Sequence, residues 1–220
     1  MDAFMIEATA EQLFAQARGI TGIADLIDSE IAERLERLLQ SLNTEAQLSA
    51  SGAAAFERRL LRLLCNRLRM LRDFREHPEI QEQAIVRPVF MTGAPRTGST
   101  KLHKMLAASG DFRFIEAWQG FNLSLRTGNR DESPAERLRE SDDYALWLDE
   151  HAPNARIVHE YSSREPDEDS LILEHCLHAP YLVAFAFVPS YAQWYMAQDP
   201  RPNIAFVRRV NPRRGNQLWQ

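Results

Sequence analysis

The spacing of apolar residues predicts a helical region over residues 1–80. Apolar side chains recur every three or four positions in successive segments, which is the period of an amphipathic helix. Thr9 and Gln12 stand three residues apart ahead of the first segment, as in a capping box. The last segment is the longest and predicts a helix over residues 53–74.

The predicted helix over residues 53–74 has an apolar face and an opposite face rich in arginine. The arginines of that second face are Arg58, Arg59, Arg62, Arg69 and Arg72. Like charges at helical spacing are typical of a face in contact with solvent. The alternative is that some of these guanidinium groups bind an anionic ligand or a partner, and the sequence leaves both interpretations open.

Residues 85–110 show a different order: a short apolar run, a loop bracketed by glycines, and a helical pattern. The run at residues 88–91 predicts a strand, and the loop follows it from Gly93 to Gly98. Glycines allow backbone N–H groups to converge on one point, where the N-terminus of the next helix adds its positive dipole. The segment therefore predicts a cradle for a phosphate or sulfate group. Its glycine spacing is that of a P-loop, but Ser99 occupies the position of the P-loop lysine.

Strand-like and helical patterns alternate through the next part of the chain. Residues 112–115 and 156–159 predict two further short strands. Between them, residues 123–133 predict a loop and residues 135–151 predict a helix. The acidic run over residues 160–169 is expected to cap and orient the helix that follows it.

Together these patterns predict an α/β fold, in which a P-loop-like parallel sheet is flanked by helices and preceded by the N-terminal helical region. We expect the α/β part, residues 85–200, to be a partial domain with an incomplete sheet. Residues 201–220 are rich in proline and arginine, and we expect them to form an irregular C-terminal tail.

Composition and charge narrow the class of protein. Apolar residues make up 45% of the chain, enough for a packed core, and a net charge of -5 gives no reason to expect a nucleic-acid partner. The longest apolar run, residues 179–189, is too short to span a bilayer, and residues 1–10 lack the basic start of a signal peptide. We expect Cys65 and Cys176 to be buried free thiols in a reducing, cytoplasmic setting.

The loop at residues 93–100 reads Gly-Ala-Pro-Arg-Thr-Gly-Ser-Thr and resembles the 5′-phosphosulfate loop of sulfotransferases that use 3′-phosphoadenosine 5′-phosphosulfate (PAPS). It is most similar to the bacterial branch, whose loop reads Pro-Arg-Thr-Gly-Ser/Thr-Thr. Three later features fit the same branch and extend the resemblance over about residues 89–198. They are Trp118 after a strand, His159 ahead of Glu165-Pro166-Asp167-Glu168-Asp169, and Val188-Pro189-Ser190-Tyr191 with Trp194.

The resemblance implies a P-loop-like α/β fold and transfer of a sulfuryl group from PAPS to a hydroxyl or amine of a small-molecule acceptor. The residues that it assigns to donor binding are Arg96, Thr97, Gly98, Ser99 and Thr100. Backbone amides and hydroxyls of the loop would hold the 5′-phosphate. Arg96 would replace the P-loop lysine, because a guanidinium fork matches the phosphosulfate oxygens. No metal is needed, and the sequence has no His/Cys spacing that demands one.

Sulfuryl transfer also requires a base that takes the proton of the acceptor. His159 is the leading candidate, because it ends a predicted strand and its ordinary pKa of about 6.5 suits the task. The alternative is that His159 only caps that strand or binds the acidic run. Glu116 is the second candidate, since some relatives use a glutamate after the second strand. Where the family tends to have Trp-Glu, this chain has Trp118-Gln119.

Sulfotransferases bind the 3′-phosphate of PAPS through an arginine and a serine well downstream of the loop, and the sequence shows no segment of that kind. We therefore expect a truncated chain that corresponds to the N-terminal half to two-thirds of a full enzyme, with exposed sheet edges. Two alternatives stay open: a P-loop kinase or NTPase, which Ser99 disfavours, and a non-catalytic remnant that keeps the anion loop. The sequence leaves homo-oligomerisation undecided.

Overall fold

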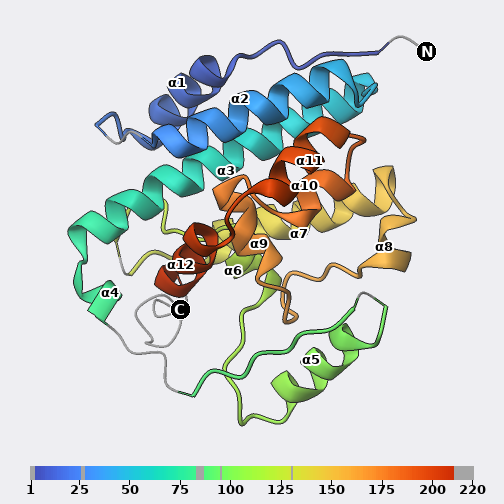
Figure 1. Ribbon diagram of the computed structural model, residues 1–220. Coiled ribbons are helices and arrows are strands. Elements are labelled where there is room, and N and C mark those ends of the chain that lie inside the picture. Colours follow the sequence, from blue (N-terminus) through green and yellow to red (C-terminus); the bar gives the residue numbers. More distant parts are fainter. Residues whose placement is uncertain (1–2, 26–27, 83–86, 95, 130, 211–220) are drawn as a thin grey trace.

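The computed structural model of the 220-residue chain describes residues 3–25, 28–82, 87–94, 96–129 and 131–210 (Figure 1). The N-terminal part contains α1 (Ala10–Thr21), α2 (Ser29–Thr44), α3 (Ala50–Glu76) and α4 (Glu79–Glu82). The expected capping box is present at the start of α1. The Thr9 N–H donates to Gln12 Oε1 at 2.9 Å, and the Gln12 N–H donates to Thr9 Oγ1 at 3.2 Å.

Helix α3 is the central element of the N-terminal part. Its leucine stripe is buried against α1 and α2 and forms one continuous core with them. The buried leucines of this core include Leu13, Leu35, Leu38, Leu60, Leu63 and Leu64. Complete burial of such a side chain contributes about 1.5–3 kcal/mol. The predicted helix over residues 53–74 is therefore confirmed, and it is longer than predicted at both ends.

The arginine side of α3 is also buried, so the prediction of a solvated face is wrong for four of the five arginines. Arg69 and Arg72 are each 9% exposed, and Arg59 and Arg62 both pair with the carboxylate of Glu174. Arg58 alone among the five has an exposed side. The physical reason is a second layer of helices that covers this side of α3. Carboxylates and carbonyls meet the guanidinium groups of Arg59, Arg62 and Arg72 there, which offsets the cost of burying these charges.

The second layer is built from short helices of the later sequence (Figure 1). They are α6 (Ala117–Phe121), α7 (Ala135–His151), α8 (Ala155–Val158), α9 (Ser170–Leu173), the 3-10 helix η1 (Glu174–Cys176), α10 (Pro180–Ala184), α11 (Pro189–Ala197) and α12 (Arg201–Val210). η1 packs on α3, α11 packs on α2, and α12 packs on α9. The predicted helix at residues 135–151 is confirmed.

Helix α12 corrects the expectation of an irregular tail from residue 201 onward. Phe206 and Val210 lie four residues apart on one face of α12, and both are buried. Pro202 stands in the first turn, where the missing N–H group costs no helical hydrogen bond. Residues 211–220, the rest of the expected tail, lie outside the described residues.

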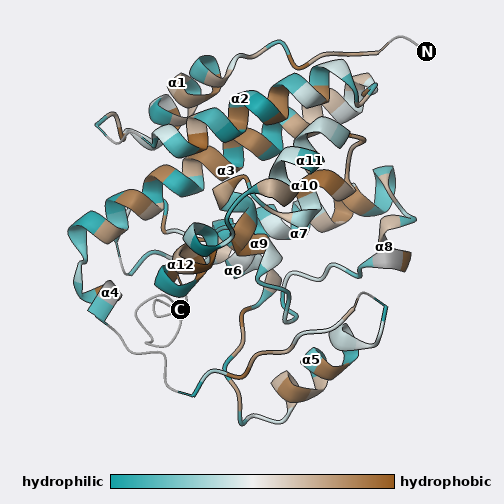
Figure 2. Cartoon of the chain, viewed as in Figure 1, coloured by the Kyte–Doolittle hydropathy of each residue, from teal (hydrophilic) through white to brown (hydrophobic). Residues whose placement is uncertain are grey.

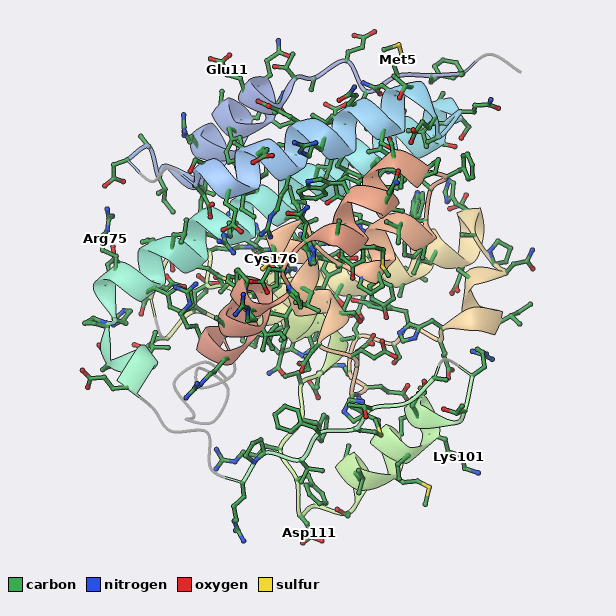
Figure 3. All side chains as sticks on the ribbon, in the orientation of Figure 1. Met5, Glu11, Arg75, Lys101, Asp111 and Cys176 are labelled. Atoms are coloured by element: carbon green, nitrogen blue, oxygen red, sulfur yellow. The ribbon has the colours of Figure 1, made fainter. Side chains whose placement is uncertain are left out.

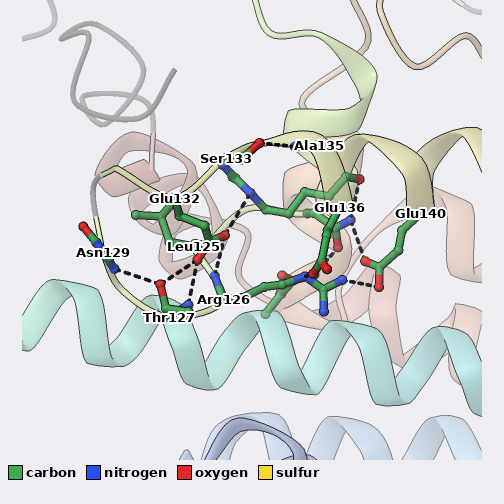
Figure 4. A network of polar contacts seen from close by, with 12 residues as sticks. Leu125, Arg126, Thr127, Asn129, Glu132, Ser133, Ala135, Glu136 and Glu140 are labelled. Carbon is green, nitrogen blue, oxygen red and sulfur yellow. Dashed lines mark hydrogen bonds and ion pairs between the residues drawn. The ribbon is translucent and has the colours of Figure 1, made fainter.

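Residues 122–129 and 131–134 belong to the predicted loop, and a network around Glu132 holds them in place (Figure 4). The carboxylate of Glu132 accepts hydrogen bonds from the N–H groups of Arg126 at 3.1 Å and Thr127 at 2.8 Å. The guanidinium of Arg126 pairs in turn with Glu140 of α7. The network therefore joins the loop to α7, and the Arg72 guanidinium of α3 donates to the Leu125 carbonyl of the same loop at 3.0 Å.

The parallel sheet of the predicted α/β fold is not confirmed. Within the described ranges, residues 88–91 and 112–115 form no strand, and residues 155–158 form the single turn of α8. The β-type pairing that is described is an isolated antiparallel bridge between Glu116 and Pro166. A strand needs a neighbour for its N–H and C=O groups, whereas the turn at α8 supplies its own, since the His159 N–H donates to the Ala155 carbonyl at 2.8 Å.

Helix α5 (Ser99–Ala108), which follows the anion loop, stands apart from the helical body (Figure 1). Among its described residues none is buried, and Leu102 and Met105 are 48% and 61% exposed. Figure 2 shows apolar residues on this outlying helix, and in Figure 3 Lys101 points away from the body. The expected apolar face of α5 is present, but the described part of the chain does not bury it.

We expect Glu174→Ala to lower the free energy of unfolding by about 3–5 kcal/mol, because two buried guanidinium groups would lose their counter-charge. Urea unfolding followed by circular dichroism measures this change. The matched control is Glu33→Ala, which breaks the exposed pair between Arg37 and Glu33 and should cost less than about 1 kcal/mol. Equal small losses in both variants would contradict a structural role for the Glu174 pair.

Candidate functional site

The anion loop begins α5 through a left-handed glycine. Gly98 has φ 91°, a conformation that an L side chain rarely adopts, and its carbonyl accepts the first helical hydrogen bond from Leu102 N at 3.0 Å. The Thr97 hydroxyl donates to the Ala94 carbonyl at 2.7 Å and closes the loop on itself. The first N–H groups of a helix have no partner inside that helix. The loop therefore presents donors of the kind that an anion requires.

Arg96 connects this loop to the segment that precedes His159. Its backbone has φ 67°, and its Nη2 donates to the Ile157 carbonyl at 3.2 Å. The structure thus brings the predicted cation of the loop to within two residues of the predicted base. Sequence separation hides this proximity, because the donor and the acceptor of that hydrogen bond are 61 positions apart in the chain.

Lys104 makes a second connection between α5 and the acidic run. Its Nζ pairs with Glu160 at 3.1 Å and with Glu165 at 2.5 Å. The hydrogen bond to Glu165 is the main cause that raises the pKa of Lys104, and burial opposes it. Sequence reasoning gave Lys104 no role. Two features of the sequence could have indicated a role for Lys104. It lies about one turn into the helix after the loop, and the acidic run at residues 160–169 offers carboxylates with which a lysine can pair.

His159 forms a close pair with Asp167. Its Nε2 lies 3.0 Å and 3.3 Å from the two carboxylate oxygens of Asp167 and 3.2 Å from the Tyr181 hydroxyl. The hydrogen bond to Asp167 is the main cause that raises the pKa of His159; burial opposes the shift, the charges of Asp167 and Glu168 add to it, and Lys104 reduces it. A carboxylate on one ring nitrogen fixes the tautomer and orientation of an imidazole, which is how proteins prepare a histidine to accept a proton.

Sequence reasoning left open that His159 binds the acidic run, and the structure shows this contact at Asp167, which the sequence did not single out. The acidic run was expected to cap the following helix, and one oxygen of Asp167 does accept the N–H of Glu168 at 2.6 Å. The same carboxylate, however, also holds His159. Its side chain is 4% exposed, whereas that of His159 is 25% exposed. The carboxylate of Asp167 is therefore buried, while the imidazole of His159 that it holds is partly open to solvent.

Glu116 lies beside the same acidic run but is engaged in local structure. Ala117 N donates to the Glu165 carbonyl at 2.8 Å, and Asp167 N donates to the Ile115 carbonyl at 3.2 Å. The Glu116 carboxylate accepts the indole N–H of Trp118. Gln119 Oε1 accepts the Glu116 N–H at 3.0 Å, so the glutamine at this position helps to begin α6.

The structure therefore gathers the predicted site residues around one segment, residues 157–167. Arg96 and Lys104 reach this segment from the loop and from α5, and the backbone at Glu116 pairs with it. The motif near residue 190 lies elsewhere: the buried Tyr191 packs in the core with α2, and its hydroxyl donates to the Leu177 carbonyl. That motif holds the fold and does not contribute to the site.

No three His, Cys, Asp or Glu side chains of the described ranges gather closely enough to hold a metal ion. Among the helices that the structure describes, none is long and apolar enough to cross a membrane.

Comparison with known proteins gives one family. Residues 88–213 match the model of the sulfotransferase family. The chain is similar to the crystal structure of sulfotransferase STF1 from Mycobacterium tuberculosis, with a TM-score of 0.72 and 28% identity over 95% of this chain and 58% of that one. It also has the fold of sulfotransferase STF9 from Mycobacterium avium, with a TM-score of 0.74 and 20% identity over 96% of this chain and 55% of that one.

No curated protein gives a significant sequence match. The chain spans a little over half the length of the two solved structures that it matches. The alternative of a P-loop kinase or NTPase is not favoured by these matches.

We expect His159 to titrate above its ordinary pKa of about 6.5 and Asp167→Asn to lower that midpoint. A raised folded-state pKa stabilises the protein fully below about pH 6.5, and this stabilisation is lost as the pH rises through the folded pKa. NMR titration of the His159 ring proton measures the midpoint in both proteins.

The control for this titration is His178, whose pKa burial lowers and which does not contact Asp167. Its midpoint should stay the same in the variant. A His159 midpoint that Asp167→Asn leaves in place would contradict the pairing.

Proposed function

The chain belongs to the sulfotransferase family, and from this premise we propose that it binds PAPS and moves its sulfuryl group to a hydroxyl or amine of a small-molecule acceptor. One observation carries the proposal. Arg96 and Lys104 hold the anion loop and α5 against the segment that contains His159. A site of this kind has an anion cradle and a prepared base within one small region.

We assign the 5′ end of the donor to the start of α5. The N–H groups of Thr97, Gly98, Ser99 and Thr100 would surround the 5′-phosphosulfate, and the hydroxyls of Ser99 and Thr100 would add donors. Arg96 would exchange its bond to the Ile157 carbonyl for a bidentate contact with the phosphosulfate oxygens. Charge grows on the leaving phosphate during the reaction, so these donors favour the transition state.

We assign the proton transfer to His159 in preference to Glu116. Because Nε2 faces Asp167, Nδ1 is the ring nitrogen that would take the acceptor's proton. The acceptor oxygen or nitrogen forms its bond to sulfur, the bond between sulfur and the phosphate oxygen breaks, and the proton moves to His159. The products are the sulfated acceptor and adenosine 3′,5′-bisphosphate. Glu116 is the weaker candidate, because its carboxylate already accepts the Trp118 indole N–H.

The proposal covers the 5′ half of the donor site, since the chain spans a little over half the length of its solved relatives. It requires no metal. The buried free thiols Cys65 and Cys176 support a reducing compartment, and we place the protein in the cytoplasm on that ground.

We expect the protein to bind adenosine 3′,5′-bisphosphate more tightly than ATP. Arg96→Ala should weaken that binding about 10- to 100-fold, since a hydrogen bond to a charged group contributes about 1.5–3 kcal/mol. Isothermal titration calorimetry measures both affinities. Arg113→Ala is the matched control, because Arg113 is exposed beyond the far end of α5. Preference for ATP, or full affinity in Arg96→Ala, would refute the assignment of the loop.

We expect His159→Ala to lower the turnover number about 100- to 10,000-fold, the usual contribution of a general base. Glu116→Gln should reduce it far less. The measurement is the release of adenosine 3′,5′-bisphosphate from PAPS in the presence of a panel of hydroxyl and amine acceptors. Nucleotide binding should survive in both variants. The larger loss in Glu116→Gln would reverse the assignment of the base.

A further inference from the structure

The acidic run at residues 160–169 lies beside the anion loop, where it is an unfavourable neighbour for a negatively charged ligand. The run contains five carboxylates, those of Glu160, Glu165, Asp167, Glu168 and Asp169. The phosphates and the sulfate of the proposed donor are anionic, and like charges repel each other more strongly as water is removed from between them. An anion site next to this run therefore requires a cation that compensates the nearest carboxylates.

Lys104 of α5 is placed to be that cation. Its Nζ lies 3.1 Å from a carboxylate oxygen of Glu160 and 2.5 Å from one of Glu165, so that one positive charge stands between two negative charges. The acidic run has a cation of its own, Arg164, but that residue is exposed and takes part in neither of these pairs. The compensation of both carboxylates thus comes from α5.

The position of Lys104 on α5 brings these two carboxylates to the face of the helix that the donor is proposed to occupy. Thr100, which we assign to donor binding, and Lys104 are four residues apart in α5 and therefore share a face. Long side chains of a helix point back toward its N-terminus, which here is the anion loop. Without Lys104, Glu160 and Glu165 would face the bound anion with no compensating charge from α5.

The attachment of α5 to the body is polar. None of the described residues of α5 is buried, so apolar burial contributes little to holding this helix in place. The side chains of Lys104, Glu160 and Glu165 are 29%, 61% and 44% exposed. Ion pairs this open to solvent are weakened by salt. Besides these pairs, the Arg96 guanidinium donates to the Ile157 carbonyl, which is also a polar contact.

We propose that Lys104 is a positioning residue with two tasks: it docks the donor loop and α5 on the segment that contains His159, and it neutralises Glu160 and Glu165 so that this face of α5 accepts an anion. This role rests on the proposed function and adds the residue that makes an acidic segment compatible with an anionic donor. Because the docking depends on exposed charges, high salt releases α5 from the segment.

The docking task is tested without any nucleotide, by the distance between nitroxide labels at Ala108→Cys on α5 and Asp142→Cys on α7. Both positions are exposed, whereas the native Cys65 and Cys176 are buried. We expect a narrow distance distribution that broadens in about 1 M NaCl, where the Debye length is about 3 Å, and in Lys104→Met. The matched control is Lys101→Met, because Lys101 is exposed on the same helix and points away from the body (Figure 3).

A distribution that stays narrow both in Lys104→Met and at high salt would overturn the docking task. Circular dichroism establishes that the variants are folded. If Lys104→Met does not fold, the salt series on the labelled protein with native Lys104 decides the question.

The neutralising task is tested by calorimetry with adenosine 3′,5′-bisphosphate. Lys104→Met should weaken binding about tenfold, because two carboxylates then face the anion. Lys104→Arg keeps the charge and should restore the affinity. The combination Lys104→Met/Glu160→Gln/Glu165→Gln should also restore it, since the repelling charges are gone, a recovery that a merely structural defect would not show. Turnover should stay about 100-fold low in the combination, because the docking is still absent.

The two measurements separate this role from the proposed function. If the unaltered protein binds the nucleotide and Lys104→Met binds it equally well, the neutralising task is overturned and the proposed function stands. The same follows if the combination binds as weakly as Lys104→Met. If the unaltered protein does not bind the nucleotide, the proposed function is overturned together with the neutralising task, while the label distances still decide the docking.

Discussion

The buried carboxylate of Glu174 is the constraint on which the arrangement of both layers depends. It is 1% exposed and pairs with both Arg59 and Arg62, which α3 would otherwise bury without a counter-charge. Removal of such a partner is costly, whereas the intact pair adds little net stability of its own. Its consequence is geometric, because Glu174 belongs to η1 and both guanidinium groups extend from α3, so the two pairs join η1 to α3. The helices before and after η1 are then placed with it.

That placement determines the candidate site. α9 immediately precedes η1 and packs on α6, where the Cβ of a residue at Gly120 would come within 2.9 Å of Leu171. This close approach holds α6 against α9, and the backbone pairing between Glu116 and Pro166 joins the start of α6 to the segment that contains Asp167. Asp167 in turn orients His159, and Arg96 and Lys104 attach the anion loop to the same segment. The contacts that hold the helices together therefore also place the residues of the candidate site. Helix α5 is attached to this arrangement through Arg96 and Lys104, and none of its described residues is buried.

Sequence reasoning predicted the helices well because apolar period and caps are local features. The capping box at Thr9 and the helix at residues 135–151 follow from neighbours in the chain. The strands were not predictable in the same way, since an apolar run such as residues 88–91 becomes a strand where a partner lies beside it. The prediction that the arginine face of α3 is exposed to solvent was wrong for a related reason. A sequence pattern shows which residues share a face of a helix, but not which other elements cover that face. The family, the loop and His159 were accessible to sequence. The role of Lys104 was not, because its partner Glu160 lies 56 residues away in the chain. Asp167 lies eight residues from His159, but the sequence does not show which carboxylate of the acidic run meets the imidazole.

The most direct test of the central claim follows the backbone amides while adenosine 3′,5′-bisphosphate is added. The claim is that the start of α5 binds the 5′ end of this nucleotide next to His159. It predicts saturable NMR chemical-shift changes at the amides of residues 97–100 and at the His159 ring, with little change along α1. Changes confined to other parts of the chain, or no change at residues 97–100 at saturation, would contradict it.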